Sequence, residues 1–135
     1  MNDFLPINKK EMLERGWQDV DFVFVTGDSY VDHPSFGVAI LTRLLEKEGY
    51  RVAVLSQPNW KNDGDFTQFG RPRLAFMVTS GNIDSMVAHY TAAKRLRHDD
   101  AYTAGGIAGK RPDRAVIVYS NIIKRIYPDC PVIIG

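Results

Sequence analysis

The stretch DFVFVTGDSYVDHPSFG, Asp21 to Gly37, contains the pattern that decides the fold. It opens with a continuous apolar run of strand length, which stops at Gly27. A helical pattern follows, because Val38, Leu41 and Leu45 recur at spacings of three to four residues. We expect Leu41 and Leu45 to lie in the core. A buried strand, a polar loop and a helix in this order predict the first unit of a parallel α/β sheet.

The rest of the chain repeats this alternation. Strands are predicted at 51–56, 74–81 and 131–135, helices at 8–16, 82–97 and 113–129, and one helical turn near Asp65. Part of the segment 113–129 would also fit a strand, but the spacing of Val116, Tyr119 and Ile123 favours a helix. We therefore expect one α/β domain, 1–135, with a flavodoxin-like or Rossmann-like parallel sheet of order 2-1-3-4 and helices on both faces.

The loop after the first strand is rich in polar side chains, and its place in such a sheet is informative. Ligands bind where the strand order reverses, at the carboxyl ends of the strands. The loops after the first and third strands would face each other there. The candidate ligand or domain-interface residues are Asp28, Tyr30, Asp32, His33, Ser80, Asn82 and Asp84.

Structural roles also suit part of this loop. Ser35 after Pro34 fits an N-cap of the next helix, and Asp28 can cap a turn. Asp32 and His33 are sequence neighbours whose side chains diverge, so no metal site is predicted. A hydrolase built on these acidic and imidazole groups ranks lowest, because no nucleophile is paired with a base at a recognisable spacing.

Composition limits the class of protein. The chain has 135 residues, of which 44% are hydrophobic, so it is able to bury a core. A net charge of +1 predicts no general attraction to nucleic acid or membranes, and no segment resembles a membrane span or a secretory signal. Cys130 is the single cysteine, which fits a reducing compartment. The expected location is the cytoplasm.

Residues 97–112 show no periodicity and contain three glycines. Their AGGIAGKR motif lacks the spacing of a phosphate-binding loop. A mixed-charge solvated surface is the simpler interpretation, and the alternative is a docking loop in which Arg97, Lys110 and Arg111 contact an anionic surface. In that case we expect the loop to become ordered only beside the rest of a larger protein.

Several motifs in colinear order resemble a known family. HPSFGVAILTRLLEKEGYRVAVLSQP, 33–58, is similar to the cobalamin-binding-like domain that precedes the catalytic core in many radical SAM enzymes. More closely, GDSYVDHPSFG, GRPRLAFMVTSGNIDSMVAHYTA, AGKRPDRA and CPVIIG resemble the N-terminal domain of the YgiQ-type radical SAM proteins. The similarity covers nearly the whole chain.

This resemblance implies that the chain is the front part of a larger protein, truncated before a radical SAM domain. That domain would hold a 4Fe-4S cluster and bind S-adenosylmethionine, and it would be this chain's partner. The cluster motif CxxxCxxC is absent here, so the chain is expected to be non-catalytic alone, with no cofactor and an unknown substrate. The cobalamin-ligating motif DxHxxG is absent as well, so ligation by His33 is not expected. The alternative is a self-sufficient flavodoxin-like module that binds a nucleotide or a cobalamin-like ligand between strands one and three.

Overall fold

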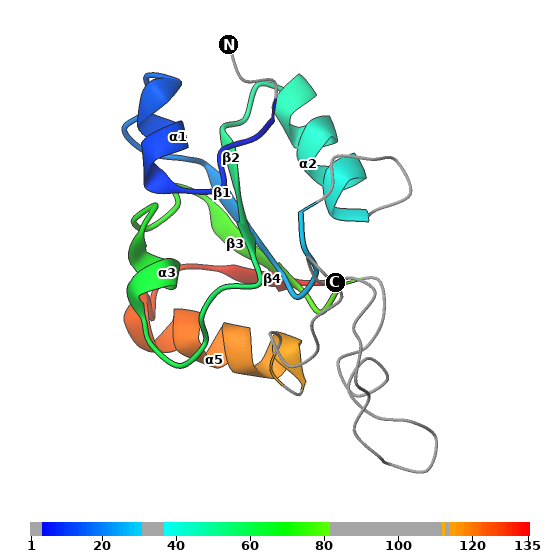
Figure 1. Cartoon of the computed structure of the whole chain (residues 1–135), viewed down its shortest axis with the longest axis vertical. Coiled ribbons are helices and arrows are strands. Elements are labelled where there is room, and N and C mark those ends of the chain that lie inside the picture. Colours follow the sequence, from blue (N-terminus) through cyan, green and yellow to red (C-terminus); the bar gives the residue numbers. More distant parts are fainter. Residues whose placement is uncertain (1–3, 31–36, 82–111, 113) are drawn as a thin grey trace.

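A computed structural model describes residues 4–30, 37–81, 112 and 114–135. They form a parallel sheet between two layers of helices (Figure 1). The strands are β1 (Phe22–Thr26), β2 (Val52–Ser56), β3 (Ala75–Thr79) and β4 (Val132–Ile134), in the order β2-β1-β3-β4. The predicted α/β class and strand order are confirmed.

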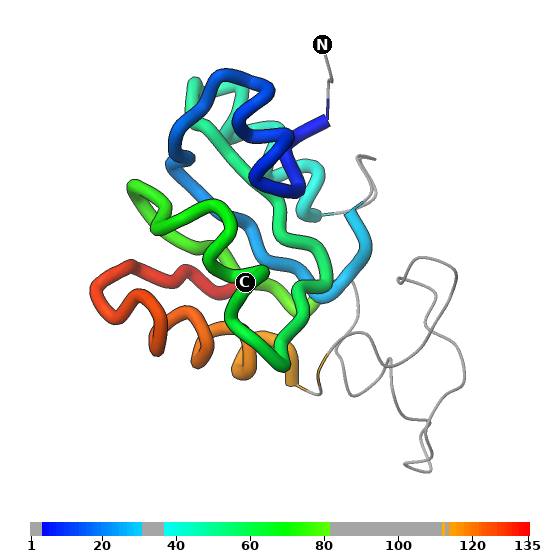
Figure 2. Tube along the Cα trace, turned by 60° about the vertical axis from the view of Figure 1, so that its left-hand side comes forward, coloured from blue at the N-terminus to red at the C-terminus, as the bar shows by residue number. Residues whose placement is uncertain are grey.

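The helices divide between the two faces of the sheet. Helix α2 (Gly37–Lys47) covers one face, whereas α3 (Gly64–Thr67) and α5 (Ala115–Ile126) lie on the other (Figures 1 and 2). The chain crosses the sheet in one direction from β1 to β2 and in the opposite direction from β2 to β3 and from β3 to β4. Because crossover connections are right-handed, this reversal places α2 opposite the other two helices.

The two faces of the sheet are filled to different extents. The larger cluster lies on the α5 side and includes Val23, Val25, Phe66, Phe76, Val78, Tyr119 and Ile123. The smaller cluster, beneath α2, has Leu5, Val52 and Val54 at its centre. The ambiguous segment is helical from Ala115 to Ile126, as its spacing predicts, and the buried side of this helix, α5, closes the larger core.

Helix α1 (Lys9–Glu14) has the ends that the sequence predicts. The side-chain Oδ1 of Asn8 accepts a hydrogen bond from the Glu11 N–H at 2.9 Å. The Glu11 carboxylate accepts from the Ile7 N–H, one residue before the donor of a standard capping box. Gly16, with φ +80°, follows the helix and takes the left-handed conformation that favours glycine.

Helix α2 departs from expectation at Leu41. The apolar pattern predicts this side chain in the core, but it is 49% exposed. The buried residues of α2 are the small Ala39 and Thr42, and Leu45 is half-buried beside the smaller cluster. The expectation for Leu41 is therefore wrong, since the helix approaches the sheet along a narrower face than its apolar pattern predicts. The predicted helix at 82–97 and the predicted docking loop at 97–112 fall almost wholly outside the described residues.

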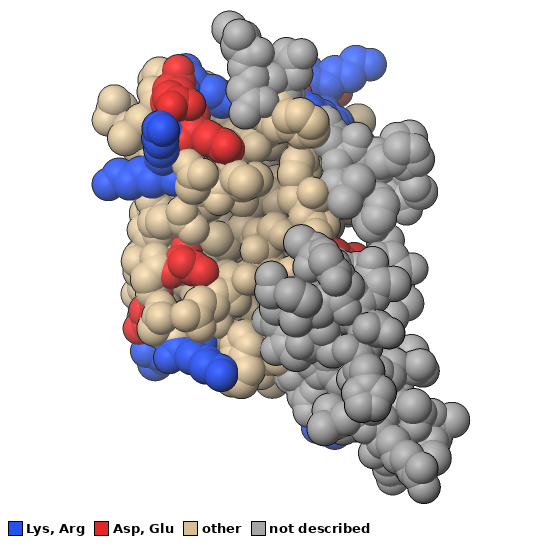
Figure 3. Space-filling model, viewed as in Figure 1, with Lys and Arg blue, Asp and Glu red and all other residues tan. Residues whose placement is uncertain are grey.

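An exposed ion pair joins α5 to the start of α3. The two terminal nitrogens of Arg125 donate to the carboxylate of Asp63 at 2.9 and 2.7 Å. These hydrogen bonds to Arg125 hold the pKa of Asp63 below its ordinary value of 3.8. On the face that Figure 3 shows, charged groups of both signs are scattered rather than gathered in a patch of one sign.

This pair predicts a small pH-dependent stability difference. The pKa of Asp63 is lower in the folded state than in the unfolded state. The stabilisation by the ion pair is therefore present above about pH 3.8, and it is lost as the pH falls through the pKa of folded Asp63. We expect Arg125→Gln to lower the urea midpoint slightly at pH 7, since exposed pairs contribute little. The urea midpoints of the parent protein and of the Arg125→Gln variant should converge in acid. A difference that stays constant down to pH 2 would contradict this role of the pair.

Candidate functional site

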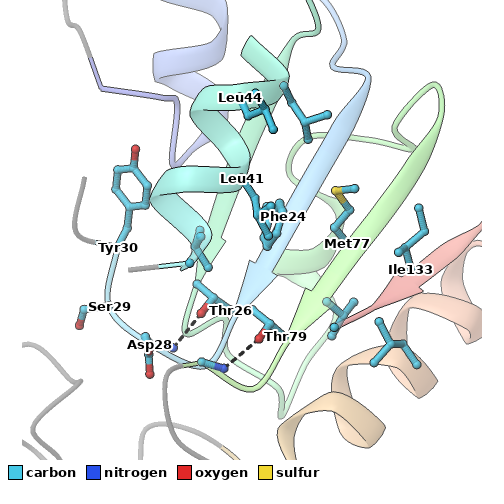
Figure 4. A pocket seen from close by; sticks show the side chains of 17 residues that line it. Phe24, Thr26, Asp28, Ser29, Tyr30, Leu41, Leu44, Met77, Thr79 and Ile133 are labelled. Carbon is cyan, nitrogen blue, oxygen red and sulfur yellow. Dashed lines mark hydrogen bonds between the residues drawn. The ribbon is translucent and has the colours of Figure 1, made fainter. Parts of the chain in front are cut away.

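Strands β1 and β3 end in the same local structure, side by side. The Oγ1 atom of Thr26 accepts a hydrogen bond from the Asp28 N–H at 3.1 Å, and Oγ1 of Thr79 accepts from the Gly81 N–H at 3.2 Å (Figure 4). Thr26 and Thr79 are also partners in the sheet register. The loops after the first and third strands therefore begin next to each other, as expected for the point where the strand order reverses.

The two loops touch through Asp28 and Gly81. The Asp28 side chain is buried, with 3% exposure. Gly81 has φ +112°, and a Cβ atom at this position would overlap the carboxylate of Asp28. Glycine is thus required twice, for its backbone conformation and for the close approach of the carboxylate. This contact holds the first loop against the end of β3.

The end of β2 holds the first loop from the other side. The Ser56 hydroxyl donates to the carbonyl of Asp28 at 2.8 Å and accepts from the Tyr30 N–H at 2.9 Å. The Nε2 group of Gln57 donates to the carbonyl of Gly27 at 3.1 Å. Sequence reasoning missed Ser56 and Gln57. A signal for them was present in the sequence. Ser56 and Gln57 are polar and stand at the end of the second predicted strand, so they lie at the same edge of a parallel sheet as the loops after the first and third strands.

The structure describes three of the predicted site residues, Asp28, Tyr30 and Ser80, and the first two line one cavity beside α2. Tyr30 packs on the smaller cluster, and Figure 4 shows it on the opposite side of α2 from Met77 and Ile133. The carboxylate of Asp28 points away from Leu41 in the same view. Ser80 is half-buried next to Gly81. The other candidates lie outside the described residues: Asp32, His33, Asn82, Asp84, Arg97, Lys110 and Arg111.

A cavity of about 370 Å³ opens between α2 and the sheet. Its floor is a row of register partners on β1, β3 and β4, namely Phe24, Met77 and Ile133. Leu41 and Leu44 of α2 form one wall (Figure 4). Sequence reasoning also missed this cavity, although the broad apolar side of α2 was visible in the pattern. We refer to it as the α2 groove.

The lining of the α2 groove is mostly apolar, and its polar side chains are those of Thr26, Asp28, Ser29, Tyr30 and Thr79. Asp28 is the one charged side chain among its described lining residues. Within the described ranges, no group of three or more His, Cys, Asp or Glu side chains is placed to hold a metal ion. None of the described helices has the length and apolar character needed to cross a membrane.

Comparisons with known proteins give one consistent result. The family model for the radical SAM N-terminal domain matches residues 4–135. A UPF0313 protein of Clostridium botulinum is 59% identical over 133 residues, which are 98% of this chain and 21% of that protein. A UPF0313 protein of Thermotoga maritima is 56% identical over 132 residues, or 98% of this chain and 23% of that protein. The chain thus spans about a fifth of the length of these relatives. No solved structure matches.

Proposed function

We propose, since this chain belongs to the radical SAM N-terminal family, that it is the accessory front domain of a longer radical SAM protein and is non-catalytic alone. The observation that carries this proposal is the α2 groove. Catalytic pockets combine an apolar wall with convergent polar groups. Asp28, Ser29 and Tyr30 are among the residues that line the groove, but most of its lining is apolar. The half-exposed aliphatic side chains of Leu41, Leu44 and Ile133 border the cavity, as in a surface made for packing.

The residues of this chain do not fit an iron-sulfur cluster. A cluster takes several cysteine thiolates, whereas this sequence contains Cys130 alone. That side chain is fully buried, and burial raises the pKa of its thiol, which favours the protonated form. We therefore assign the 4Fe-4S cluster and S-adenosylmethionine to the domain that follows in the longer relatives.

Anaerobic reconstitution with iron and sulfide tests this assignment. The 135-residue chain should stay colourless and retain no stoichiometric iron, because one buried thiol cannot hold a cluster. The remainder of the Clostridium botulinum relative, expressed without its matched domain, should bind iron and cleave S-adenosylmethionine. A brown chromophore with iron bound to the 135-residue chain would overturn the accessory role.

A self-sufficient ligand-binding module is the second candidate. The volume of the α2 groove, about 370 Å³, favours it, because small-molecule sites fall between about 300 and 1,000 Å³. A nucleotide is the weaker choice of ligand, since the Asp28 carboxylate that lines the groove would repel phosphate groups. Equilibrium dialysis against ATP and against hydroxocobalamin separates the two functions: micromolar binding of either compound by the 135-residue chain would favour the module.

A further inference from the structure

The side of α2 that lines the α2 groove is apolar, and the described residues cover it only in part. Leu41 and Leu44 are 49% and 54% exposed, and both line the α2 groove. The side of α2 that is buried consists of Ala39 and Thr42. A surface helix normally turns its large apolar residues to the core and its polar residues to water. These two leucines are therefore placed to contact another element that packs beside α2.

The sheet shows the same imbalance between its two faces. On the α5 face, Phe76 is fully buried between its register partners in β1 and β4. On the α2 face, exposure rises along the row from Phe24, which is 5% exposed, through the half-buried Met77 to Ile133, which is 50% exposed. Parallel sheets are usually covered on both faces. Among the described residues, the outer half of the α2 face, over β3 and β4, lacks such a cover.

The position of β4 indicates what fills this space. Ile133, Ile134 and Gly135, at the carboxyl end of β4, line the α2 groove. Figure 1 marks the C-terminus at this end of β4. The Clostridium botulinum relative is matched over only 21% of its length, by a domain of the N-terminal type. Connections between consecutive elements are usually short. A segment that follows β4 would therefore reach the groove through a short loop, which costs little entropy to close.

We propose that the α2 groove is the docking site of the segment that directly follows β4 in the longer protein. That segment packs beside α2 as an amphipathic helix whose apolar side covers Leu41, Leu44, Met77 and Ile133. A helix is the element that covers the open face of a parallel sheet in α/β domains. This inference rests on the proposed function in one respect, namely that further polypeptide follows the domain.

Thiol labelling measures directly whether the α2 groove is covered. It uses two cysteine substitutions, one on the α2 face and one on the α5 face of the domain. Ile133→Cys places a thiol in the α2 groove, and Ile117→Cys places one on α5, where the parent side chain is similarly exposed at 55% against 50%. Each variant is prepared in the 135-residue chain and in a chimera, in which this chain replaces the matched part of the Clostridium botulinum relative. Native Cys130 is fully buried, so its slow labelling reports that each protein is folded.

In the 135-residue chain, we expect the two introduced thiols to react with maleimide at rates within about threefold of each other, as exposed sites do. In the chimera, the thiol at position 133 should react at least about tenfold more slowly, because labelling then requires local opening. The thiol at position 117 should keep its rate. If the chimera fails the Cys130 check, the aligned positions of the intact relative are substituted instead.

Three results would overturn the docking proposal. Equal rates at position 133 in both proteins would show that the following polypeptide does not cover the groove. Protection in the 135-residue chain at every concentration would assign the groove to residues of this chain, such as 82–111. Protection in the 135-residue chain that disappears on dilution would mean that a second copy of this chain covers the groove. The accessory role is tested separately, by the iron content of the 135-residue chain. A failure of the docking proposal can therefore be distinguished from a failure of the proposed function.

Discussion

Replacing Ile123 by Ala is expected to lower the free energy of unfolding by about 2–5 kcal/mol, which is the usual cost of a large-to-small change in a core. Ile123 is fully buried in the larger cluster on the α5 face of the sheet. The substitution removes apolar contacts and leaves a cavity that neighbouring side chains fill only in part. Since domains of this kind are stable by about 5–15 kcal/mol, the loss would be evident in urea denaturation at pH 7.

The matched control is Ile117→Ala, on the same helix. The Ile117 side chain is 55% exposed, so its truncation leaves no buried cavity, and alanine is the better helix former. We expect a change within about 0.5 kcal/mol, as for most surface substitutions. Equal losses from the two substitutions would mean that α5 does not pack on the sheet with the face described.

The second large effect is expected at Gly81. Alanine here would hold a non-glycine residue at φ +112°, which costs about 1–3 kcal/mol. Its Cβ atom would also overlap the Asp28 carboxylate, and overpacking adds about 1–3 kcal/mol. The control is Gly49→Ala, because Gly49 has φ +94° and a Cβ atom added there would meet no other atom within 4 Å. The control should show the backbone cost alone.

A double-mutant cycle separates the two parts of the Gly81 effect. In an Asp28→Ala background, Gly81→Ala should lose the overlap and cost about as much as Gly49→Ala. Residues in direct contact show interaction energies of about 0.5–3 kcal/mol in such cycles. The same cost of Gly81→Ala with and without the Asp28 carboxylate would rule out the described contact between the loops after β1 and β3.

The elements and their order followed from local patterns in the chain. Apolar runs such as 22–26 and 52–56 end at polar or glycine-containing turns, and α1 begins at the Asn8 cap. These signals depend on residues a few positions apart, so they are readable in one dimension. The strand order did not follow from such signals: 2-1-3-4 was predicted by analogy with flavodoxin-like sheets, and the structure confirms it.

The site was predictable only in its position. The sequence placed the loops after the first and third strands at one edge of the sheet, and the Thr26 and Thr79 turns lie there. Which side chains meet at that edge depends on register and on close approach. The contact of Asp28 with Gly81, and the support from Ser56, join residues that are far apart in the chain.

By itself, the sequence determined that the chain alternates buried strands and helices, and that polar residues collect at the carboxyl end of the first strand. Only the tertiary structure decided that Leu41 faces a groove rather than the core, because its burial depends on which neighbour α2 has on that side. The apolar pattern records that a side chain avoids water. It does not record whether the covering atoms come from the same domain or from polypeptide beyond it, since hydrophobic burial is non-directional and both covers remove the same surface from water.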